Sequence, residues 1–132
     1  TRLLTVSSLL RGYSSLSLPT LLAPLADDFT HRVLPSSLHV PPHDLDAFVA
    51  HARSMFSIFR EFEMIPVEVF EDAEQDAVVV FAKMEGTTKE GEKWENECVM
   101  LVRLTGDGEG VKEVVEFVDS KKAGEMRGRF RP

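Results

Sequence analysis

The stretch from Trp94 to Ser120 restricts the folds open to this chain more than any other segment. Apolar and β-branched residues fill its two arms, and the glycine-rich run 105–110, TGDGEG, lies between them. Glycine tolerates the positive φ angles of tight hairpin turns, so the segment predicts two long strands joined by a turn. Side chains alternate along a strand, and both faces of the second arm carry apolar residues. This pattern is typical of a curved sheet that is covered on both sides.

The remaining segments predict helices and strands that pack against this hairpin. The strongest helical pattern follows the pair Pro41-Pro42, where apolar residues form one long stripe. We expect helices over 2–14, 17–25 and 43–62, with 26–28 ending the second helix, and further strands over 29–34, 67–71 and 78–84. This element order predicts an α+β fold in which an antiparallel sheet curls around the long helix.

Composition indicates a single globular domain. Of the 132 residues, 43% are hydrophobic and 28% are charged, which is enough apolar material for one core. We expect this domain to occupy residues 1–120 and to be followed by a locally basic tail over 121–132. The formal net charge of -7 argues against nucleic-acid binding, because Lys and Arg are needed to neutralise phosphate.

Cys98 is the single cysteine, so no disulfide can form within the chain. This favours a reducing intracellular setting, and we expect a cytoplasmic protein. No run of about 18 apolar residues occurs, so we expect no membrane association. The first residue is Thr1 rather than Met, and we therefore expect the chain to be trimmed.

Several segments together resemble one known family. They are LADDFTHRVLPSSL, the helix after Pro42, WENECVMLVRL and GEGVKEVVEFVDS. The most specific are the start of one strand, with Trp94, Asn96 and Glu97, and the end of the next, Glu116 to Ser120. They resemble the SnoaL-like branch of the nuclear-transport-factor-2-like superfamily, especially its fungal members. The resemblance implies a cone made from a bent antiparallel sheet, with helices closing its wide end over an apolar pocket.

The resemblance alone does not assign a reaction. The superfamily includes polyketide cyclases, scytalone dehydratase, ketosteroid isomerase, epoxide hydrolases, terpenoid isomerases and non-catalytic binding domains. No histidine follows His51, which departs from the histidine pair of scytalone dehydratase, and Tyr13 is the only tyrosine, which departs from the ketosteroid isomerase pattern. Cys98 stands where many fungal relatives carry an aromatic residue, so we expect a wider or reshaped pocket.

Asp119 is the leading candidate for the catalytic acid or base. It follows the apolar run 114–118, and apolar surroundings suit a carboxyl group to proton transfer if Asp119 points into the cone. The resemblance to SnoaL-like cyclases implies the same role, because an Asp near this strand end acts as their acid/base. A second interpretation is equally open, since Asp is also favoured in turns and can cap the turn before Ser120.

Other candidate residues surround the same expected pocket. We expect His31 to assist as a proton-exchanging imidazole, or else to be a core histidine bonded to a carbonyl group or to Asp28. Trp94 and Asn96 share a face and are candidates for positioning a substrate carbonyl, or else for core packing and a backbone hydrogen bond. The predicted substrate contacts also include Tyr13 from the first helix, which alternatively only packs, and Phe117.

Some charged and polar residues favour structural interpretations. Glu97 and Glu116 occur in strands that look buried, and pairing with Arg103 or Lys112 is the safer interpretation. His39 and His43 have the spacing of a helical metal pair, but the prolines between them break such a helix. We therefore expect no metal site and no cofactor.

The sequence thus predicts a cofactor-free isomerase or cyclase that acts on an apolar polyketide-like or terpenoid-like substrate by acid/base catalysis. The alternative is a non-catalytic module of the same fold that binds an apolar ligand or dimerises. We expect a homodimer in either case, formed through outer-face residues such as Val99, Leu101 and Val114.

Overall fold

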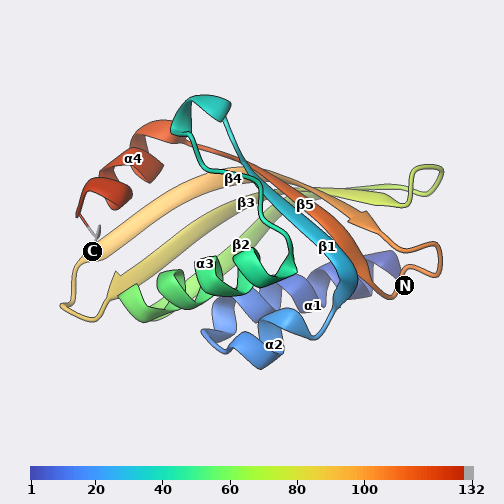
Figure 1. Cartoon of the computed structure of the whole chain (residues 1–132), viewed down its shortest axis with the longest axis horizontal. Coiled ribbons are helices and arrows are strands. Elements are labelled where there is room, and N and C mark those ends of the chain that lie inside the picture. Colours follow the sequence, from blue (N-terminus) through green and yellow to red (C-terminus); the bar gives the residue numbers. More distant parts are fainter. Residues whose placement is uncertain (130–132) are drawn as a thin grey trace.

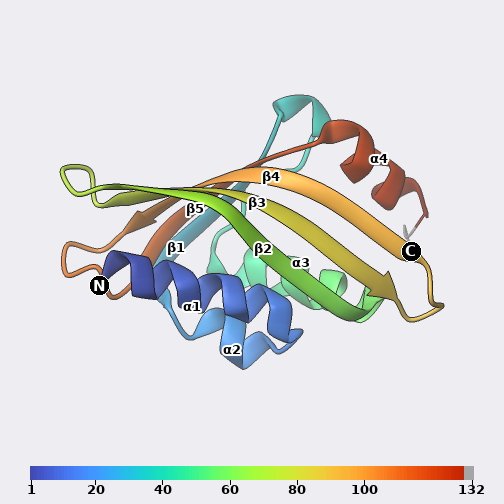
Figure 2. The same ribbon diagram turned by 180° about the vertical axis from the view of Figure 1, so that it is seen from behind.

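The computed structural model describes residues 1–129, which form helices and one sheet. In chain order the elements are α1 (Arg2–Ser15), α2 (Leu18–Leu22), β1 (Leu25–Leu34), the short 3-10 helix η1 (Ser36–Leu38), α3 (Leu45–Ile58), β2 (Phe59–Asp72), β3 (Ala77–Thr88), β4 (Lys93–Leu104), β5 (Val111–Val118) and α4 (Ser120–Arg129). The sheet bends strongly, and α1, α2 and α3 lie on its concave side (Figure 1). Seen from behind, α1 runs beneath β2 and α4 lies at the opposite end of the molecule, beyond β4 (Figure 2). This arrangement confirms the α+β cone.

The five strands are ordered β1-β5-β4-β3-β2 in the sheet. Strands β2 to β5 form the expected antiparallel meander, and the predicted hairpin pairs β4 with β5. The expectation of a wholly antiparallel sheet is wrong for β1, which pairs with β5 in parallel. Connectivity explains this, because α3 carries the chain from β1 to the opposite edge of the sheet and leaves β5 as the only neighbouring strand of β1.

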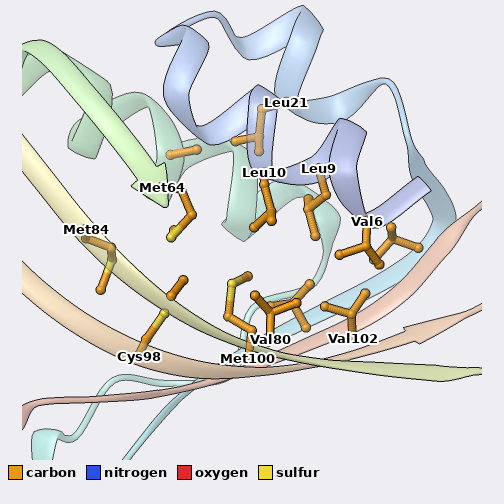
Figure 3. Packing of buried hydrophobic residues seen from close by; sticks show 14 of the residues in the cluster. Val6, Leu9, Leu10, Leu21, Met64, Val80, Met84, Cys98, Met100 and Val102 are labelled. Carbon is orange, nitrogen blue, oxygen red and sulfur yellow. The ribbon is translucent and has the colours of Figure 1, made fainter. Parts of the chain in front are cut away.

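The core lies between the helices and the concave face. Leu9 and Leu10 of α1 point toward Val80 and Met100 of the sheet (Figure 3), and all four side chains are buried. Gly12 allows α1 and α2 to approach each other closely, since a Cβ atom at Gly12 would lie 2.7 Å from the Cα atom of Leu21. The alternation predicted for β4 is confirmed, because Asn96, Cys98, Met100, Val102 and Leu104 are all buried.

The long helix ends earlier than its apolar stripe predicts. It spans Leu45–Ile58 rather than 43–62, and Phe59 and Phe62 belong to β2. Strand pairing overrides the helical spacing, since Phe62 is paired with Gly86 in β3. A register shift between Phe59 and Glu61 keeps both phenylalanines buried although they are three residues apart.

Two other boundaries differ from the sequence prediction. Residues 26–28 do not end α2 but lie in β1, which begins at Leu25. The segment from 121 onward, expected as a basic tail, belongs to α4 as far as Arg129, and residues 130–132 lie outside the described residues. Met126 of α4 is buried against the core.

The outer face of the sheet carries an apolar patch, which we define as Phe81, Val99 and Phe117. These residues are directly paired across β3, β4 and β5. Val99 and Phe117 are 46% and 55% exposed. Val114, which we expected on this face, is wholly buried on the inner side, because Leu101 is paired with Val115 and Val102 with Val114.

Among the described residues, no helix has the length and apolar character required to cross a membrane.

Candidate active site

A small cavity lies between the sheet and α3, close to the core. Its volume is about 60 Å³. The lining residues are Tyr13, His31, Phe48, His51, Ala52, Met55, Phe56, Phe59, Phe62, Met64, Met84 and Glu116. Most of this lining is apolar and comes from α3, β2 and β3, whereas Tyr13, His31 and Glu116 come from α1, β1 and β5.

Glu116 is the centre of a buried polar cluster. The Tyr13 hydroxyl group donates a hydrogen bond of 2.9 Å to Glu116 Oε1, and His31 Nε2 lies 2.9 Å from the same oxygen. Both bonds use Oε1, so Glu116 Oε2 has no hydrogen-bond partner among the described residues. Glu116 therefore lines a mostly apolar cavity and keeps one carboxylate oxygen with free lone pairs.

The surroundings of Glu116 favour its ionised form. Burial acts to raise the pKa of this carboxyl, but the charge and hydrogen bond of His31 and the hydrogen bond from Tyr13 together hold its pKa below the usual value. Burial and the adjacent Glu116 raise the pKa of the Tyr13 hydroxyl well above its usual value of 10.0, so Tyr13 remains a hydrogen-bond donor. Burial also raises the pKa of the Cys98 thiol, which keeps this neighbour protonated.

Two further histidines pack against His31. His43 Nδ1 lies 2.9 Å from His31 Nδ1, and the His51 ring centroid lies 5.6 Å from that of His31. Burial, and then the charge of His31, lower the pKa of His51 to about 4, so its imidazole is neutral at pH 7. No group of three or more His, Cys, Asp or Glu side chains within residues 1–129 is arranged to hold a metal ion.

An open groove of about 1130 Å³ adjoins the cavity. Phe62 lines both spaces, and the ring of Trp94 in the groove is nearly parallel to that of Phe62, with centroids 6.3 Å apart. Trp94 Nε1 is buried and has no hydrogen-bond partner in the part of the chain that the structure describes. Arg60 and Lys93 are among the charged residues at the rim of this groove.

The structure brings together only some of the residues predicted as a site. His31 and Tyr13 meet at Glu116, and Trp94 lies in the adjoining groove. Asp119 lies outside the cavity, is exposed, and accepts hydrogen bonds from the Lys121 and Lys122 backbone N–H groups at the start of α4.

Asn96 and Phe117 are also separated from the cavity. Asn96 is buried and accepts a hydrogen bond from the Glu97 backbone N–H group. It lines a separate pocket of about 280 Å³ together with Asp119. Phe117 belongs to the outer patch and is more than half exposed.

Comparison with known proteins places this geometry in a family. Residues 6–118 match the model of the SnoaL-like domain. The chain belongs to the SnoaL-like family. It is 24% identical over 127 residues to core atranone cluster protein 11 of Stachybotrys chlorohalonatus, a match that covers 96% of this chain and 94% of the relative. It is 26% identical over 117 residues to monooxygenase ptaG of Pestalotiopsis fici, covering 89% of this chain and 81% of the relative.

The crystal structure of the BvnE pinacolase from Penicillium brevicompactum has the same fold. Its TM-score with this SnoaL-like domain is 0.90 at 16% identity, and the match covers 97% of this chain and 92% of that chain. At this identity the likeness shows the shared fold, which is the nuclear-transport-factor-2-like cone.

Sequence reasoning did not select Glu116, His43 or His51 as functional residues of this SnoaL-like domain. Glu116 and Phe117 lie on opposite sides of β5 and Asp119 follows the last residue of the strand, so the choice depends on which side of the strand faces inward. The buried residues Val114 and Val118 share the parity of Glu116. The sequence carries a signal for an inward-facing Glu116, because β-branched valines occur two positions before and two positions after it. Asp119 comes at the end of this run.

The neutral His51 of this domain predicts a loss of stability in acid. Its pKa falls from 6.5 to about 4 on folding, so the unfolded chain binds a proton that the folded chain does not. We expect the free energy of unfolding to decrease by about 2 to 3 kcal/mol between pH 7.5 and pH 4.5, as measured by urea denaturation. The lowered pKa of His43 acts in the same direction.

Two variants identify the source of this loss. His51→Asn should remove most of the decrease, whereas His39→Asn, at an exposed residue with a positive φ angle that Asn tolerates, should leave it unchanged. An equal decrease in His51→Asn and the wild-type protein would exclude His51 as the cause.

Proposed function

We propose that this protein is a cofactor-free isomerase or cyclase that moves a proton on a small apolar substrate of the polyketide or terpenoid class. One observation carries the proposal: the buried carboxylate of Glu116, whose pKa is held below its usual value, lines a mostly apolar cavity and has one oxygen without a hydrogen-bond partner among the described residues. A carboxylate in such a site can remove a proton from carbon and return it, so the reaction requires no cofactor.

The cluster assigns a role to each polar group. Glu116 Oε2 would take a proton from the carbon beside a substrate carbonyl group, and the resulting carboxylic acid would return it to a second carbon atom. The neutral His51 ring lines the same cavity and would donate a hydrogen bond to the carbonyl oxygen as negative charge develops there. Tyr13 and His31 are positioning residues, because they contact Glu116 through its other oxygen.

The cavity must enlarge to accept a substrate of this class. Pockets for drug-sized molecules are about 300 Å³ or larger, whereas this cavity measures about 60 Å³. Met55, Met64 and Met84 form part of the lining, and methionine side chains adapt their shape at low energetic cost. Movement of Phe62, which lines both spaces, would join the cavity to the larger groove beside Trp94.

The names of the relatives support a role in the chemistry of small molecules. One is a core atranone cluster protein, one is called a monooxygenase, and the structural neighbour is called a pinacolase. These names differ, so a screen of polyketide-like and terpenoid-like ketones should detect rearranged, cyclised and oxygenated products by mass spectrometry.

For a substrate found in this screen, we expect Glu116→Gln to lower kcat by about 10² to 10⁴, the range typical of a lost general acid/base. Glutamine retains the shape and hydrogen-bond acceptor but cannot remove a proton. In D₂O, the wild-type protein alone should place deuterium on the product carbon, to the extent that protonated Glu116 exchanges with solvent before it returns the proton. Glu113→Gln, at a partly exposed residue of the same strand, is the matched control and should retain turnover.

The same assay tests the sequence-based assignment of Asp119. Full activity of Asp119→Asn together with inactivity of Glu116→Gln supports the proposed site. The reverse result would move the reaction to the surface pocket that contains Asp119, Asn96 and Lys122.

A second candidate function is a non-catalytic module that binds an apolar ligand or dimerises. The small resting volume of the cavity and the exposed Val99 and Phe117 of the outer patch favour it. Such a module would retain a ligand, or form a homodimer, without releasing a changed product.

A further inference from the structure

His31 and His43 are joined through both backbone and side chain. Their backbones exchange two N–H···O hydrogen bonds of 2.9 and 2.8 Å, as an isolated bridge between β1 and the segment that precedes α3. Their Nδ1 atoms lie 2.9 Å apart, and the two rings are almost parallel, with an interplanar angle of 7°. The backbone bridge therefore holds the two imidazoles side by side.

A contact of this length between two ring nitrogens requires one proton between them. Because Glu116 is ionised, His31 Nε2 donates its proton to the carboxylate, and a neutral His31 then has an unprotonated Nδ1. His43 Nδ1 must supply the shared proton, which leaves His43 Nε2 unprotonated in the resting state. Hydrogen bonds thus run without interruption from His43 through His31 to Glu116.

We propose that His43 is the port through which protons pass between solvent and the buried pair of His31 and Glu116. His43 and Glu116 are each 9% exposed, and His31 between them is 1% exposed. Glu116 lines the cavity whereas His43 does not, so the exposed surface of His43 lies outside the cavity. That this path carries protons during turnover rests on the proposed function, because the path ends at Glu116, the proposed catalytic carboxylate. The transfer path itself is a property of the protein without substrate.

Each transfer along the path conserves protons. Solvent protonates His43 Nε2, and the proton on His43 Nδ1 moves to His31 Nδ1. His43 is then neutral with its proton on Nε2, and His31 is a cation beside the Glu116 carboxylate. The His31 Nε2 proton can next move to Glu116 Oε1, so one proton has entered at His43 and one has reached the carboxyl group. The reverse sequence releases a proton to solvent.

Four other titratable groups face this path. Tyr13 from α1 and Cys98 from β4 remain protonated because their pKa values are raised. His51 from α3 remains neutral above pH 5, because its pKa is about 4. Asp44, next to His43, accepts a hydrogen bond from the Ala47 backbone N–H group and favours a positive charge on His43. Tyr13, Cys98 and His51 therefore each keep one protonation state between pH 5 and pH 8.

The test uses the whole chain labelled with ¹⁵N-histidine and needs no substrate. The chain has four histidines, so single substitutions assign every ring signal. At pH 7.5 we expect a proton on His31 Nε2 and on His43 Nδ1. On acidification, we expect the first proton to switch His43 from the Nδ1–H to the Nε2–H tautomer while His31 becomes doubly protonated. A purely structural His43 would keep its Nδ1 proton throughout.

The second readout is the rate at which the His31 ring protons exchange with water. His43→Asn places an amide donor beside His31 Nδ1 but cannot pass a proton on, so we expect exchange at least tenfold slower than in the wild-type protein. His39→Asn makes the same substitution at an exposed histidine and should leave the rate unchanged. His43→Gln is the second variant if His43→Asn does not fold.

The proposal is overturned if His43 keeps its tautomer in the wild-type titration, or if a folded His43 variant exchanges the His31 protons as fast as the wild-type protein. Both measurements are independent of turnover. If the substrate screen fails but the exchange result is positive, the proposed enzyme is rejected and the port is retained. If a substrate is found but exchange does not depend on His43, the enzyme is retained and the port is rejected.

Discussion

Replacing Glu116 with Ala should lower the free energy of unfolding by about 3 to 5 kcal/mol at pH 7, the cost of breaking a buried charge-assisted pair. The substitution leaves the His31 Nε2–H group and the Tyr13 hydroxyl group without their acceptor in a region that water reaches poorly. It also removes methylene groups from a packed interior. Urea denaturation followed by circular dichroism measures this difference.

Glu113→Ala is the matched control for this prediction. Glu113 is on the same strand, is partly exposed and forms an ion pair of 3.5 Å with Arg103. Exposed pairs of this kind contribute little, so we expect a change of about 1 kcal/mol or less. Equal stabilities of the two alanine variants would contradict the central role of Glu116 in the buried cluster.

Substitution of Phe117 in the outer patch should abolish a homodimer. We propose that two copies of the chain pair through this patch, because Val99 and Phe117 expose much of their apolar surface in the middle of the sheet. A twofold axis would place each patch against its copy, as in most homodimers. Light scattering at micromolar concentration should give the mass of two chains for the wild-type protein and of one chain for Phe117→Glu, since paired glutamates in an apolar contact repel each other.

Leu4→Glu is the control for a general effect of added charge. Leu4 is an exposed apolar residue on α1, away from the sheet face, and its substitution should leave the dimer intact. A monomeric wild-type protein would remove the dimer proposal, as would a dimeric Phe117→Glu variant.

The sequence predicts most of this fold because its strongest patterns are local. The hairpin of β4 and β5 follows from alternation and the glycine-rich turn, and α1 follows from helical spacing. The end of α3 was not predictable in this way. Phe59 and Phe62 continue the apolar stripe of the helix, and only pairing with β3 shows that they belong to a strand.

The site was less predictable because it depends on strand register. Whether Glu116 faces inward is decided by its parity on β5, and Asp119 lies just beyond the last paired residue of that strand. The parallel pairing of β1 with β5 then aligns His31 beside Val114, close enough to Glu116 for the hydrogen bond. His43 joins the cluster through a single bridge between segments far from regular pairing, and no sequence period indicates such a contact.

The polar cluster and the apolar wall of the cavity come from different elements of the fold. The polar groups to which we assign proton transfer come from α1, β1 and β5, whereas the apolar wall that a substrate would touch comes mainly from α3, β2 and β3. Substitutions in the wall can therefore alter the size and shape of an accepted molecule while the carboxylate and its partners stay in place. Under the proposed mechanism, relatives with this fold can accept different substrates while they keep the same proton-transfer groups.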